Sequence, residues 1–461
     1  MTRNQKTMLL NNVEALIKKY DVPTPRYTSY PTVPCWDVDG FSVSQWIRAV
    51  ERCFDESNES KGISVYIHLP FCESLCTYCA CNTRITKNHS VEENYIHSVL
   101  NEWHLYRYIF GAKPVIRELH LGGGTPTFFS AAHLKQLISE ILKCCTVHPQ
   151  REFSFEGHPN NTTEEHLQVL YDLGFRRVSF GVQDMDEKVQ QAIHRVQPFE
   201  NVKHVVEQSR AIGYESVGFD LIYGLPWQTQ ASVADTFQKV IQLQPDRIAF
   251  YSYAHVPWIK PGQRGYEDAD LPSDTVKRSL YDTGRALLLQ AAYHDIGMDH
   301  FAKVTDPLYV AAQNKTLHRN FMGYTTSQTN LLIGLGASAI SDAKYAYAQN
   351  AKKVEDYAFH IEPQRLAVVK GHINTHLDIL IREAILSIAC NGTLEPSLYE
   401  QVVDEKEEKQ FHQMEEEGIV VLNDLGLTVT EPGRTFIRNI CQVLDRRMHE
   451  QQHAVQFSKA I

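Results

Sequence analysis

Three cysteines at the spacing C-x3-C-x2-C are the residues whose types and spacing point most directly to chemistry. They are Cys72, Cys76 and Cys79, and a fourth cysteine, Cys81, follows after one intervening residue. Thiolates this close together on one loop can hold one face of an iron–sulfur cluster, which is normally bound by four cysteine sulfurs. With three ligands one iron stays open, and an open metal position can bind a substrate or a cofactor. We therefore expect the first three cysteines to be metal ligands.

Zinc and a disulfide are the alternatives to a cluster. Structural zinc sites have four Cys or His ligands, commonly in two separated pairs. No second C-x2-C or H-x3-H pair follows at a suitable distance, and Cys81 could complete a zinc site only if the loop doubled back sharply. Because we expect an intracellular chain, its ten cysteines favour reduced thiols over a disulfide. The spacing favours the cluster, and zinc and inert thiols stay open as alternatives.

Further candidate residues follow predicted strands. Gly122–Pro126 reads Gly-Gly-Gly-Thr-Pro, which lacks the spacing of a dinucleotide fingerprint or a P-loop. Three consecutive glycines still indicate a close approach of the backbone to a ligand, or a tight bend. Polar residues at or just past later strand ends are Glu156, Gln183, Arg195 and Asp220. Each alone is more often a structural hydrogen bonder, but four of them at one edge indicate a site, in which Arg195 suits a carboxylate.

Six strand-like segments alternate with helical segments and must position these residues. The strands are expected at Ser64–Leu69, Arg117–Leu121, Glu152–Glu156, Arg177–Phe180, Ser216–Ile222 and Arg247–Tyr253. The helices between them are expected at Val91–Phe110, Ala131–Cys144, Thr163–Leu173, Phe199–Ile212 and Gln230–Leu243. Such alternation predicts right-handed βαβ units and a parallel sheet. Because the Gly-rich, Cys-rich and polar residues follow the strands, we expect a partial (β/α)6-type barrel with its chemistry at the carboxyl ends.

Composition and charge narrow the class of protein. The chain has 461 residues, of which 43% are hydrophobic and 22% charged, and its formal net charge is −10. Lysine- or arginine-rich runs are missing from the sequence, so we expect no nucleic-acid partner. No window approaches the roughly 18 apolar residues of a membrane span, and the first 22 residues do not resemble a secretory signal. We expect a cytoplasmic monomer without a membrane partner.

The two ends of the sequence differ in character from the barrel. Residues 1–45 are expected to form a short helix and a Tyr- and Pro-rich arm, because prolines favour extended backbone. Residues 46–370 are expected to form the catalytic barrel. Residues 371–461 are expected to form a mostly helical, winged-helix-like domain with a hairpin at 418–430. This last segment is acidic, so a lid or docking role is favoured over DNA binding.

These motifs together resemble a known family. The cysteine spacing after a strand and the downstream Gly-Gly-Gly-Thr-Pro turn resemble the radical S-adenosylmethionine enzymes. The resemblance is closer to the oxygen-independent coproporphyrinogen III oxidases, and it covers essentially the whole chain. The matching segments are Pro25–Thr32, Cys72–Cys81, Gly181–Asp184, Asp220–Pro226, Gly297–Phe301 and His318–Phe321. Where relatives read Val-Asp-Pro and Phe-Gln-Gly, this chain has Gly157-His158-Pro159 and Phe321-Met322-Gly323.

The resemblance implies a set of cofactor-binding residues. A [4Fe–4S] cluster would bind to Cys72, Cys76 and Cys79, and its open iron would be chelated by S-adenosylmethionine, with a second S-adenosylmethionine beside the first. The matching contact positions are Tyr66, Tyr78, Gly123, Gly124, Thr125, Glu156, Gln183, Arg195, Asp220, Ala254 and Ile340. Glu156 is also our candidate catalytic residue, together with Cys81 as a thiol that faces the substrate.

The resemblance also implies a reaction and partners. A 5′-deoxyadenosyl radical would take a hydrogen from a substrate propionate, which then loses carbon dioxide and one electron to leave a vinyl group. Two such events turn coproporphyrinogen III, a tetrapyrrole, into protoporphyrinogen IX, with a reduced flavodoxin- or ferredoxin-like protein as electron donor. The substrate carries four propionates while the chain is acidic, so we expect local cations to bind them, and Arg26, Arg84 and Arg319 are the candidates.

Two rival functions are a related haem-binding chaperone and a radical methyltransferase that opens haem. Chaperone relatives lack the fourth cysteine and the Pro-Arg-Tyr-Thr-Ser-Tyr-Pro arm, and this chain has both. The methyltransferase would release S-adenosylhomocysteine, whereas the oxidase releases 5′-deoxyadenosine and methionine.

Overall fold

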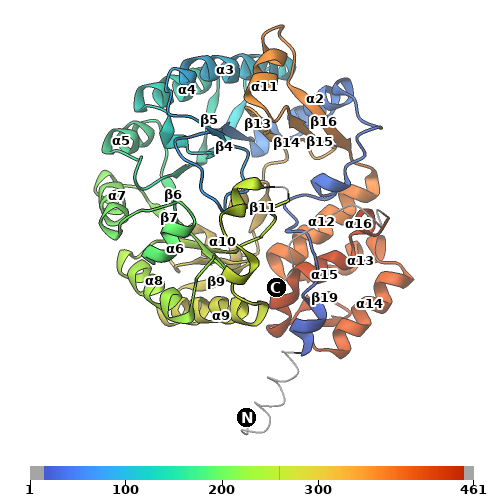
Figure 1. Ribbon diagram of the computed structural model, residues 1–461. Helices are drawn as coiled ribbons and strands as arrows, with labels where there is room; N and C mark the ends of the chain where they lie inside the picture. The colour runs from blue at the N-terminus through green and yellow to red at the C-terminus, as the bar shows by residue number, and fades with distance from the viewer. Residues whose placement is uncertain (1–14, 259, 451–461) are drawn as a thin grey trace. The chain divides into compact units, whose positions relative to one another are not determined.

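Six βα repeats build the larger part of the chain (Figure 1). The computed structural model describes residues 15–258 and 260–450, and it divides into two compact units. The barrel unit comprises Val38–Val310 and Ser327–Ile373. The second unit comprises Met1–Asp37, Ala311–Thr326 and Asn374–Ile461. This division differs from the three consecutive segments expected from the sequence, because the arm and 311–326 group with the C-terminal helices.

The barrel unit is organised around a sheet of parallel strands. Its strands are β1 (Ile63–Leu69), β4 (Val115–Gly123), β5 (Thr146–Gly157), β6 (Arg177–Gln183), β7 (Ser216–Tyr223), β8 (Arg247–Ser252) and β13 (Leu332–Leu335). They pair in the order β13-β1-β4-β5-β6-β7-β8, and each of these pairings is parallel. The predicted six strands and the partial parallel barrel are confirmed.

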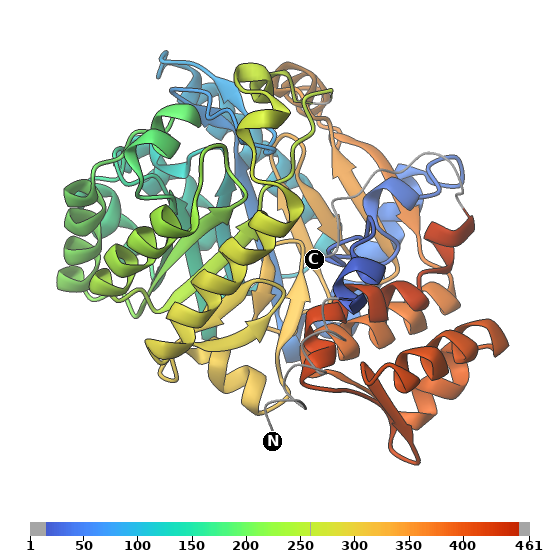
Figure 2. The same cartoon turned by 60° about the horizontal axis from the view of Figure 1, so that its bottom comes forward.

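Short antiparallel strands extend the sheet at both ends. They are β14 (Ile340–Asp342), β15 (Ala346–Asn350) and β16 (Val368–Ile373) beyond β13, and β10 (His300–Ala302) and β9 (His294–Gly297) beyond β8. Within the described residues β16 and β9 are the two ends of the sheet order, so the barrel is open. Figure 2 shows the curvature of these strands.

Helices cover the outer face of the curved sheet (Figure 1). They are α2 (Val43–Lys61), α3 (Val91–Phe110), α4 (Ala131–Lys143), α5 (Glu164–Asp172), α7 (Phe199–Ile212), α8 (Gln230–Leu243) and α9 (Asp274–Gln290). In α4 the buried residues Leu134, Leu137, Ile138 and Ile141 recur at helical spacing and form one apolar stripe. The side chain of Ser130 caps this helix by accepting the backbone N–H of His133.

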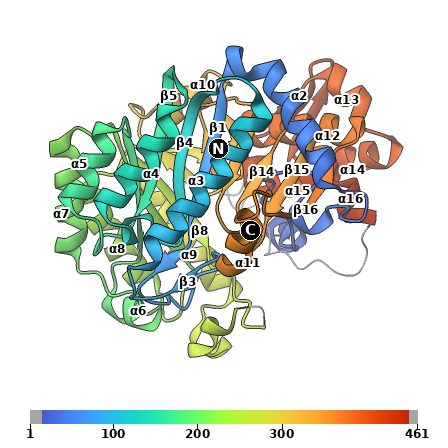
Figure 3. The same ribbon diagram turned by 90° about the horizontal axis from the view of Figure 1, so that it is seen from above.

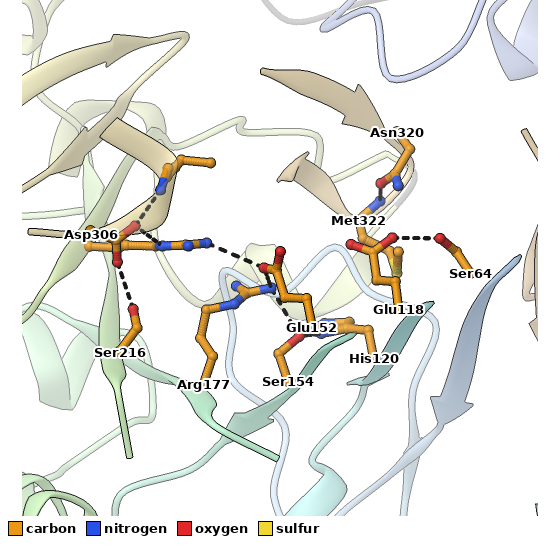
Figure 4. Close-up of polar contacts among 12 residues, drawn as sticks. Ser64, Glu118, His120, Glu152, Ser154, Arg177, Ser216, Asp306, Asn320 and Met322 are labelled. Carbon is orange, nitrogen blue, oxygen red and sulfur yellow. Dashed lines mark hydrogen bonds and ion pairs between the residues drawn. The ribbon is translucent and has the colours of Figure 1, made fainter. Parts of the chain in front are cut away.

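Alternation along each strand separates the apolar core from a polar barrel interior. In β5, Phe153 and Phe155 belong to the hydrophobic core, whereas Glu152, Ser154 and Glu156 occupy the alternate positions. Successive side chains of a strand point to opposite faces, so the second set faces the inside of the barrel. The close-up in Figure 4 shows such inward side chains from neighbouring strands pointing toward one another.

The remaining elements of the barrel unit are short. They are β2 (Phe71–Cys72), β3 (Arg84–Ile85), η2 (Pro126–Phe128), α6 (Glu187–Ala192), η3 (Pro261–Gly265), η4 (Asp268–Asp270) and α11 (Val354–Ile361). Figure 3 shows β3, α6 and the segment after β8 at the same edge of the barrel unit. This edge carries the carboxyl ends of the parallel strands.

The second unit is mostly helical, with a small antiparallel sheet in the order β17-β19-β18. Its C-terminal elements are α12 (His376–Asn391), β17 (Thr393–Leu394), α13 (Pro396–Val402), α14 (Glu405–Glu416), β18 (Val420–Asn423), β19 (Gly426–Val429), η5 (Pro432–Phe436), α15 (Ile437–Val443) and α16 (Arg446–Glu450). Its other elements are η1 (Val33–Cys35), β11 (His318–Asn320) and β12 (Gly323–Thr325), and α10 (Pro307–Gln313) straddles the boundary. The predicted helical C-terminal region and its hairpin are confirmed.

The N-terminal arm is tied to this second unit by buried polar contacts. Tyr27 Oη donates to Asp445 Oδ2 at 3.0 Å, and Arg438 Nε donates to the carbonyl of Pro25 at 3.1 Å. The start of the predicted N-terminal helix, up to residue 14, lies outside the described residues.

Candidate active site

The cysteine loop connects β1 to α3 and is held by backbone hydrogen bonds on both sides. Strands β2 and β3 pair in parallel, and the Thr77 N–H donates to the carbonyl of Ile193 at 3.0 Å. Cys72, Cys76 and Cys79 are half-buried, and all three are free thiols. The loop therefore presents three unpaired sulfurs from one short segment, as the cluster prediction requires.

The glycine turn after β4 packs directly against this loop. The Gly124 N–H donates to the carbonyl of Leu69 at 2.8 Å, and Thr125 Oγ1 lies 3.3 Å from Cys72 Sγ. A Cβ on Gly124 would stand 2.6 Å from the carbonyl oxygen of Pro70. Glycine is therefore required here for the close packing of this turn against the cysteine loop.

Arg195 brings a guanidinium to the cysteine loop from beyond α6. Its Nη1 lies 3.6 Å from Cys76 Sγ, and its Nη2 donates to the carbonyl of Gly181 at 2.7 Å. The Nε atom is buried and has no hydrogen-bond partner among the described residues. A guanidinium in this position can bind a carboxylate.

The thiols differ in their readiness to ionise. A hydrogen bond from the Cys81 thiol lowers the pKa of Cys79 to about 6, while burial raises the pKa of Cys72 to about 11. The same contact with Cys79 raises the pKa of Cys81. Cys81 thus lies beside the other three cysteines of this loop, where it contacts Cys79.

Tyr66 in β1 and Asp220 in β7 both lie near Glu156, which stands at the end of β5. A Cβ on Gly122 would stand 3.0 Å from Tyr66 Cε2 and 3.1 Å from Glu156 Oε1, so this glycine leaves room for both side chains. Burial, followed by the charge of Glu156, raises the pKa of Asp220 to about 7. Asp220 Oδ2 accepts a hydrogen bond from Ser179 Oγ at 3.3 Å.

Gln183, at the end of β6, adopts a left-handed backbone conformation with φ of 67°. A Cβ on Gly181 would stand 2.7 Å from Gln183 Nε2 and 2.8 Å from Arg195 Nη2. The structure therefore brings Gln183 and Arg195 together, as their positions after β6 predicted. A non-glycine residue in this conformation is uncommon and is found disproportionately at functional sites.

The segment after β8 contacts the far side of the cysteine loop. Gln263 Nε2 donates to the carbonyl oxygens of Ala254 at 3.1 Å and Tyr78 at 3.4 Å. Lys260 Nζ donates to the carbonyl of Cys81 at 3.3 Å. Ala254 and Tyr78, both predicted contacts of S-adenosylmethionine, are thus joined through one amide side chain.

Ile340 lies at the start of β14, where a buried carboxyl group stabilises the preceding turn. A Cβ on Gly334 would stand 2.4 Å from the carbonyl oxygen of Ile340.

Glu102 accepts hydrogen bonds from the N–H of Gly336 at 2.8 Å and from Tyr357 Oη at 2.7 Å. Burial raises the pKa of Glu102 to about 7.

The three arginines predicted to bind propionates lie in different settings. Arg84, in the barrel unit, is exposed and pairs with Glu355 at 2.9 Å. Arg319, in the second unit, is 4% exposed, and its Nη2 donates to the carbonyl of Arg26 at 3.3 Å. Its guanidinium lies 4.6 Å from the ring centroid of Tyr324, and within the described chain its Nε and Nη1 have no hydrogen-bond partner.

The departures from the family pattern lie in both units. Burial lowers the pKa of His158 to about 3, so this side chain is neutral at physiological pH. The N–H of Met322 donates to Asn320 Oδ1 at 2.8 Å and closes the turn between β11 and β12 (Figure 4).

The sequence analysis missed a set of polar residues that face the barrel interior next to Glu156. His120 Nδ1 lies 2.7 Å from Ser154 Oγ, and Arg177 Nη2 donates to the same hydroxyl at 2.9 Å (Figure 4). His120 Nε2 lies 3.4 Å from Glu156 Oε1. The polar residues at every second position of β4, β5 and β6 were the signal that could have revealed this set.

Parallel strands with a three-cysteine loop and polar residues at their carboxyl ends define a radical S-adenosylmethionine enzyme. The model of the radical SAM superfamily matches residues 66–240. An oxygen-independent coproporphyrinogen III oxidase of Escherichia coli strain K12 is 37% identical over 97% of this chain and 98% of its own length. One of Helicobacter pylori strain J99 is 37% identical over 93% of this chain and 95% of its own length.

The solved structure of coproporphyrinogen III oxidase from Escherichia coli, described as a radical SAM enzyme, superposes with a TM-score of 0.87. It is 36% identical, and the match covers 94% of this chain and 98% of that one. The chain belongs to the family of oxygen-independent coproporphyrinogen III oxidases.

The cofactors of this class, a [4Fe–4S] cluster and S-adenosylmethionine, suit the residues present. Three free thiols on one loop match the ligand set of the cluster, and the buried Nε of Arg195 is a donor without a partner among the described residues. Over residues 15–258 and 260–450, no three His, Cys, Asp or Glu side chains converge on a position for a single metal ion. The ligands of a cluster bind different iron atoms, so they need not converge in this way.

Proposed function

We propose that this protein catalyses the oxygen-independent oxidative decarboxylation of two propionates of coproporphyrinogen III to vinyl groups. The product is protoporphyrinogen IX, an intermediate of haem biosynthesis. The single observation that supports this most strongly is the full-length match, in sequence and in structure, to oxidases of that name. The three-cysteine loop at the carboxyl edge of the barrel supports it independently.

In this proposal Cys72, Cys76 and Cys79 hold the cluster, and Arg195 lies beside them as a cation. When bound, the cluster and S-adenosylmethionine supply the radical that takes a hydrogen from the propionate. The contacts proposed for one or two molecules of S-adenosylmethionine are Tyr66, Tyr78, Gly123, Gly124, Thr125, Glu156, Gln183, Arg195, Asp220, Ala254 and Ile340. Cys81 is proposed to face the substrate.

Arg319 is the strongest of the proposed propionate ligands. Its buried guanidinium has two donor atoms, Nε and Nη1, without hydrogen-bond partners among the described residues, and each of them can donate to a carboxylate. Arg26 and Arg84 are proposed beside it, but Arg84 already has Glu355 as a counterion, so its contribution should be smaller.

The electron donor is proposed to be a reduced flavodoxin- or ferredoxin-like protein, and the enzyme a cytoplasmic monomer. None of the helices in the described residues is long and apolar enough to cross a membrane.

The test of the function is an anaerobic assay. The reconstituted protein is mixed with dithionite, S-adenosylmethionine and coproporphyrinogen III, and products are followed by mass spectrometry. Protoporphyrinogen IX with 5′-deoxyadenosine, methionine and carbon dioxide is the expected result, and Cys76→Ala, which lacks one cluster ligand, should form none of them. Cofactor cleavage without loss of carbon dioxide would refute the substrate assignment. Release of S-adenosylhomocysteine would indicate methyl transfer instead.

A further inference from the structure

A chain of polar side chains runs through the interior of the barrel and ends at Glu156. From Glu156 Oε1 it passes to His120 Nε2 at 3.4 Å, and from His120 Nδ1 to Ser154 Oγ at 2.7 Å. Arg177 Nη2 lies 2.9 Å from Ser154 Oγ and 3.0 Å from Glu152 Oε1. Figure 4 shows His120, Glu152, Ser154 and Arg177, which come from the neighbouring strands β4, β5 and β6.

At the end away from Glu156, this row of polar side chains is anchored by the ion pair of Arg247 with Asp306. Arg247 Nη1 lies 3.7 Å from Glu152 Oε1, and Arg247 Nε donates to Asp306 Oδ1 at 2.7 Å. Asp306 also accepts hydrogen bonds from Ser216 Oγ and from the N–H of Leu308, each at 2.8 Å. Arg247 therefore lies between the carboxylates of Glu152 and Asp306, whereas Arg177 contacts Glu152 and the hydroxyl of Ser154.

Donor and acceptor chemistry assigns the hydrogens along this chain. A guanidinium can only donate, so Ser154 Oγ accepts from Arg177. Ser154 is fully buried, and among the described residues its printed contacts leave His120 Nδ1 as the acceptor for its hydroxyl hydrogen. His120 Nδ1 is then an acceptor, and the ring proton lies on Nε2, which points at Glu156.

The Nδ1–H tautomer of His120 does not satisfy these hydrogen-bond partners. With its proton on Nδ1, His120 would donate to Ser154, and the printed contacts within the described residues would leave the buried hydroxyl hydrogen of Ser154 without an acceptor. The bare Nε2 lone pair would then face Glu156 Oε1, so two acceptors would oppose each other. The ring of His120 also packs against the ring of Tyr66, with centroids 6.0 Å apart and an interplanar angle of 18°.

We propose that His120 is a positioning residue, fixed by Ser154 and Arg177 as the Nε2–H tautomer, that orients the carboxylate of Glu156 for S-adenosylmethionine. By donating to Oε1, His120 leaves Oε2 of Glu156 for the ligand. The side chain of Glu156 is 46% exposed, whereas that of His120 is 11% exposed, so His120 acts through Glu156 and not by contact of its own. This inference rests on the proposed role of Glu156.

The first experiment compares binding of S-adenosylmethionine to the reconstituted, unreduced holoenzyme by calorimetry. His120→Asn places its amide near the position of Nδ1 and cannot reach Glu156, whereas His120→Gln can place an amide N–H near the position of Nε2. We expect His120→Asn to raise the Kd about tenfold, equivalent to about 1.4 kcal/mol. His120→Gln should recover most of the affinity. Equal Kd values for wild type and His120→Asn, or equal losses in the two variants, would overturn the proposal.

Removing a buried hydroxyl tests whether weaker binding comes from a misoriented Glu156 or from a general destabilisation of the barrel. Ser154→Ala removes the donor to His120. Ser64→Ala removes an equally buried hydroxyl, which bonds to Glu118 and does not belong to the row of side chains that ends at Glu156. Ser154→Ala should weaken binding several-fold, and Ser64→Ala should not. Equal weakening in both variants would mean a general structural effect and would refute the positioning role.

The tautomer has its own readout, which does not depend on activity or on the cofactor. Nitrogen-15 NMR of histidine-labelled protein, with His120→Gln to assign the signal, distinguishes a protonated Nε2 from a protonated Nδ1. A protonated Nε2 and a bare Nδ1 are expected, and Ser154→Ala should shift this balance. A proton found on Nδ1 refutes the assignment. Glu156→Gln tests the underlying role separately, because unchanged affinity in that variant would reject Glu156 as a ligand even where the tautomer holds.

Discussion

Substituting the buried carboxyl Glu102 should change how the stability of the barrel unit depends on pH. Glu102 accepts hydrogen bonds from Gly336 N–H, Tyr357 Oη and Asn350 Nδ2, and it is completely buried. Burial raises its pKa from 4.5 to about 7. Between these two values the folded chain retains a proton that the unfolded chain has lost, so stability falls as the pH rises.

The size of the effect follows from the two pKa values. A pKa moved from 4.5 to about 7 corresponds to about 3 kcal/mol at high pH. Most of this, about 2 kcal/mol, develops between pH 5 and pH 8, because the unfolded carboxyl is already largely ionised at pH 5. In Glu102→Gln this contribution disappears, so wild type should lose about 2 kcal/mol relative to the variant across that range.

Equilibrium urea denaturation of the apo protein measures this difference. Tryptophan fluorescence is a suitable signal, because Trp103 lies next to Glu102 in the chain and is fully buried. Glu140→Gln, on the partly exposed surface of α4, is the matched control, and its pH profile should parallel that of wild type. Parallel profiles for wild type and Glu102→Gln would refute the reasoning, whatever their absolute offset.

Other substitutions test the site itself. Cys76→Ala should lose most of its iron on anaerobic reconstitution, whereas Cys81→Ala should keep the wild-type iron content; iron loss in Cys81→Ala would make it a ligand. Gly124→Ala should fold, as judged by circular dichroism, yet reconstitute poorly, because its Cβ would displace the cysteine loop; normal iron content would contradict this. Arg319→Gln should raise the KM for coproporphyrinogen III about tenfold or more, from the loss of a charge-assisted pair. Arg84→Gln should raise it about twofold, because Arg84 is exposed and already paired; equal effects would refute the ranking.

The parallel core of the barrel could be predicted from sequence because its strands carry strong local signals. The expected segments Arg177–Phe180 and Ser216–Ile222 correspond to β6 and β7, and the predicted bounds of α3, α7 and α8 agree with the structure. These elements alternate regularly, and apolar residues recur at the period of each structure. The three closely spaced cysteines could also be recognised in the sequence, because their spacing is a local property; their role as ligands stays a prediction.

The antiparallel additions could not be predicted, because their pairing depends on distant chain. Strands β14 and β10 have three residues each, too few to show a period, and they are strands because β13 and β8 offer free edges beside them. The same holds for the union of the N-terminal arm with the C-terminal helices. It rests on contacts such as that of Tyr27 with Asp445, more than 400 residues apart.

The contacts on the inward face of the barrel could not be predicted from short sequence patterns. Glu152 and Arg247 come from strands that are not neighbours in the sheet, so only the register of the intervening strands brings them within reach. Barrels of related architecture usually fill this space with layers of branched apolar side chains. Ion pairs in such a place add little net stability compared with apolar residues of the same volume, but breaking one partner leaves a buried charge. The charged groups instead fix which atom donates and which accepts in each hydrogen bond of this network. Each donor has few acceptors within reach, so the order of the groups in the network is set. An apolar interior could support the same barrel, but it could not determine which nitrogen of His120 carries the proton that faces Glu156.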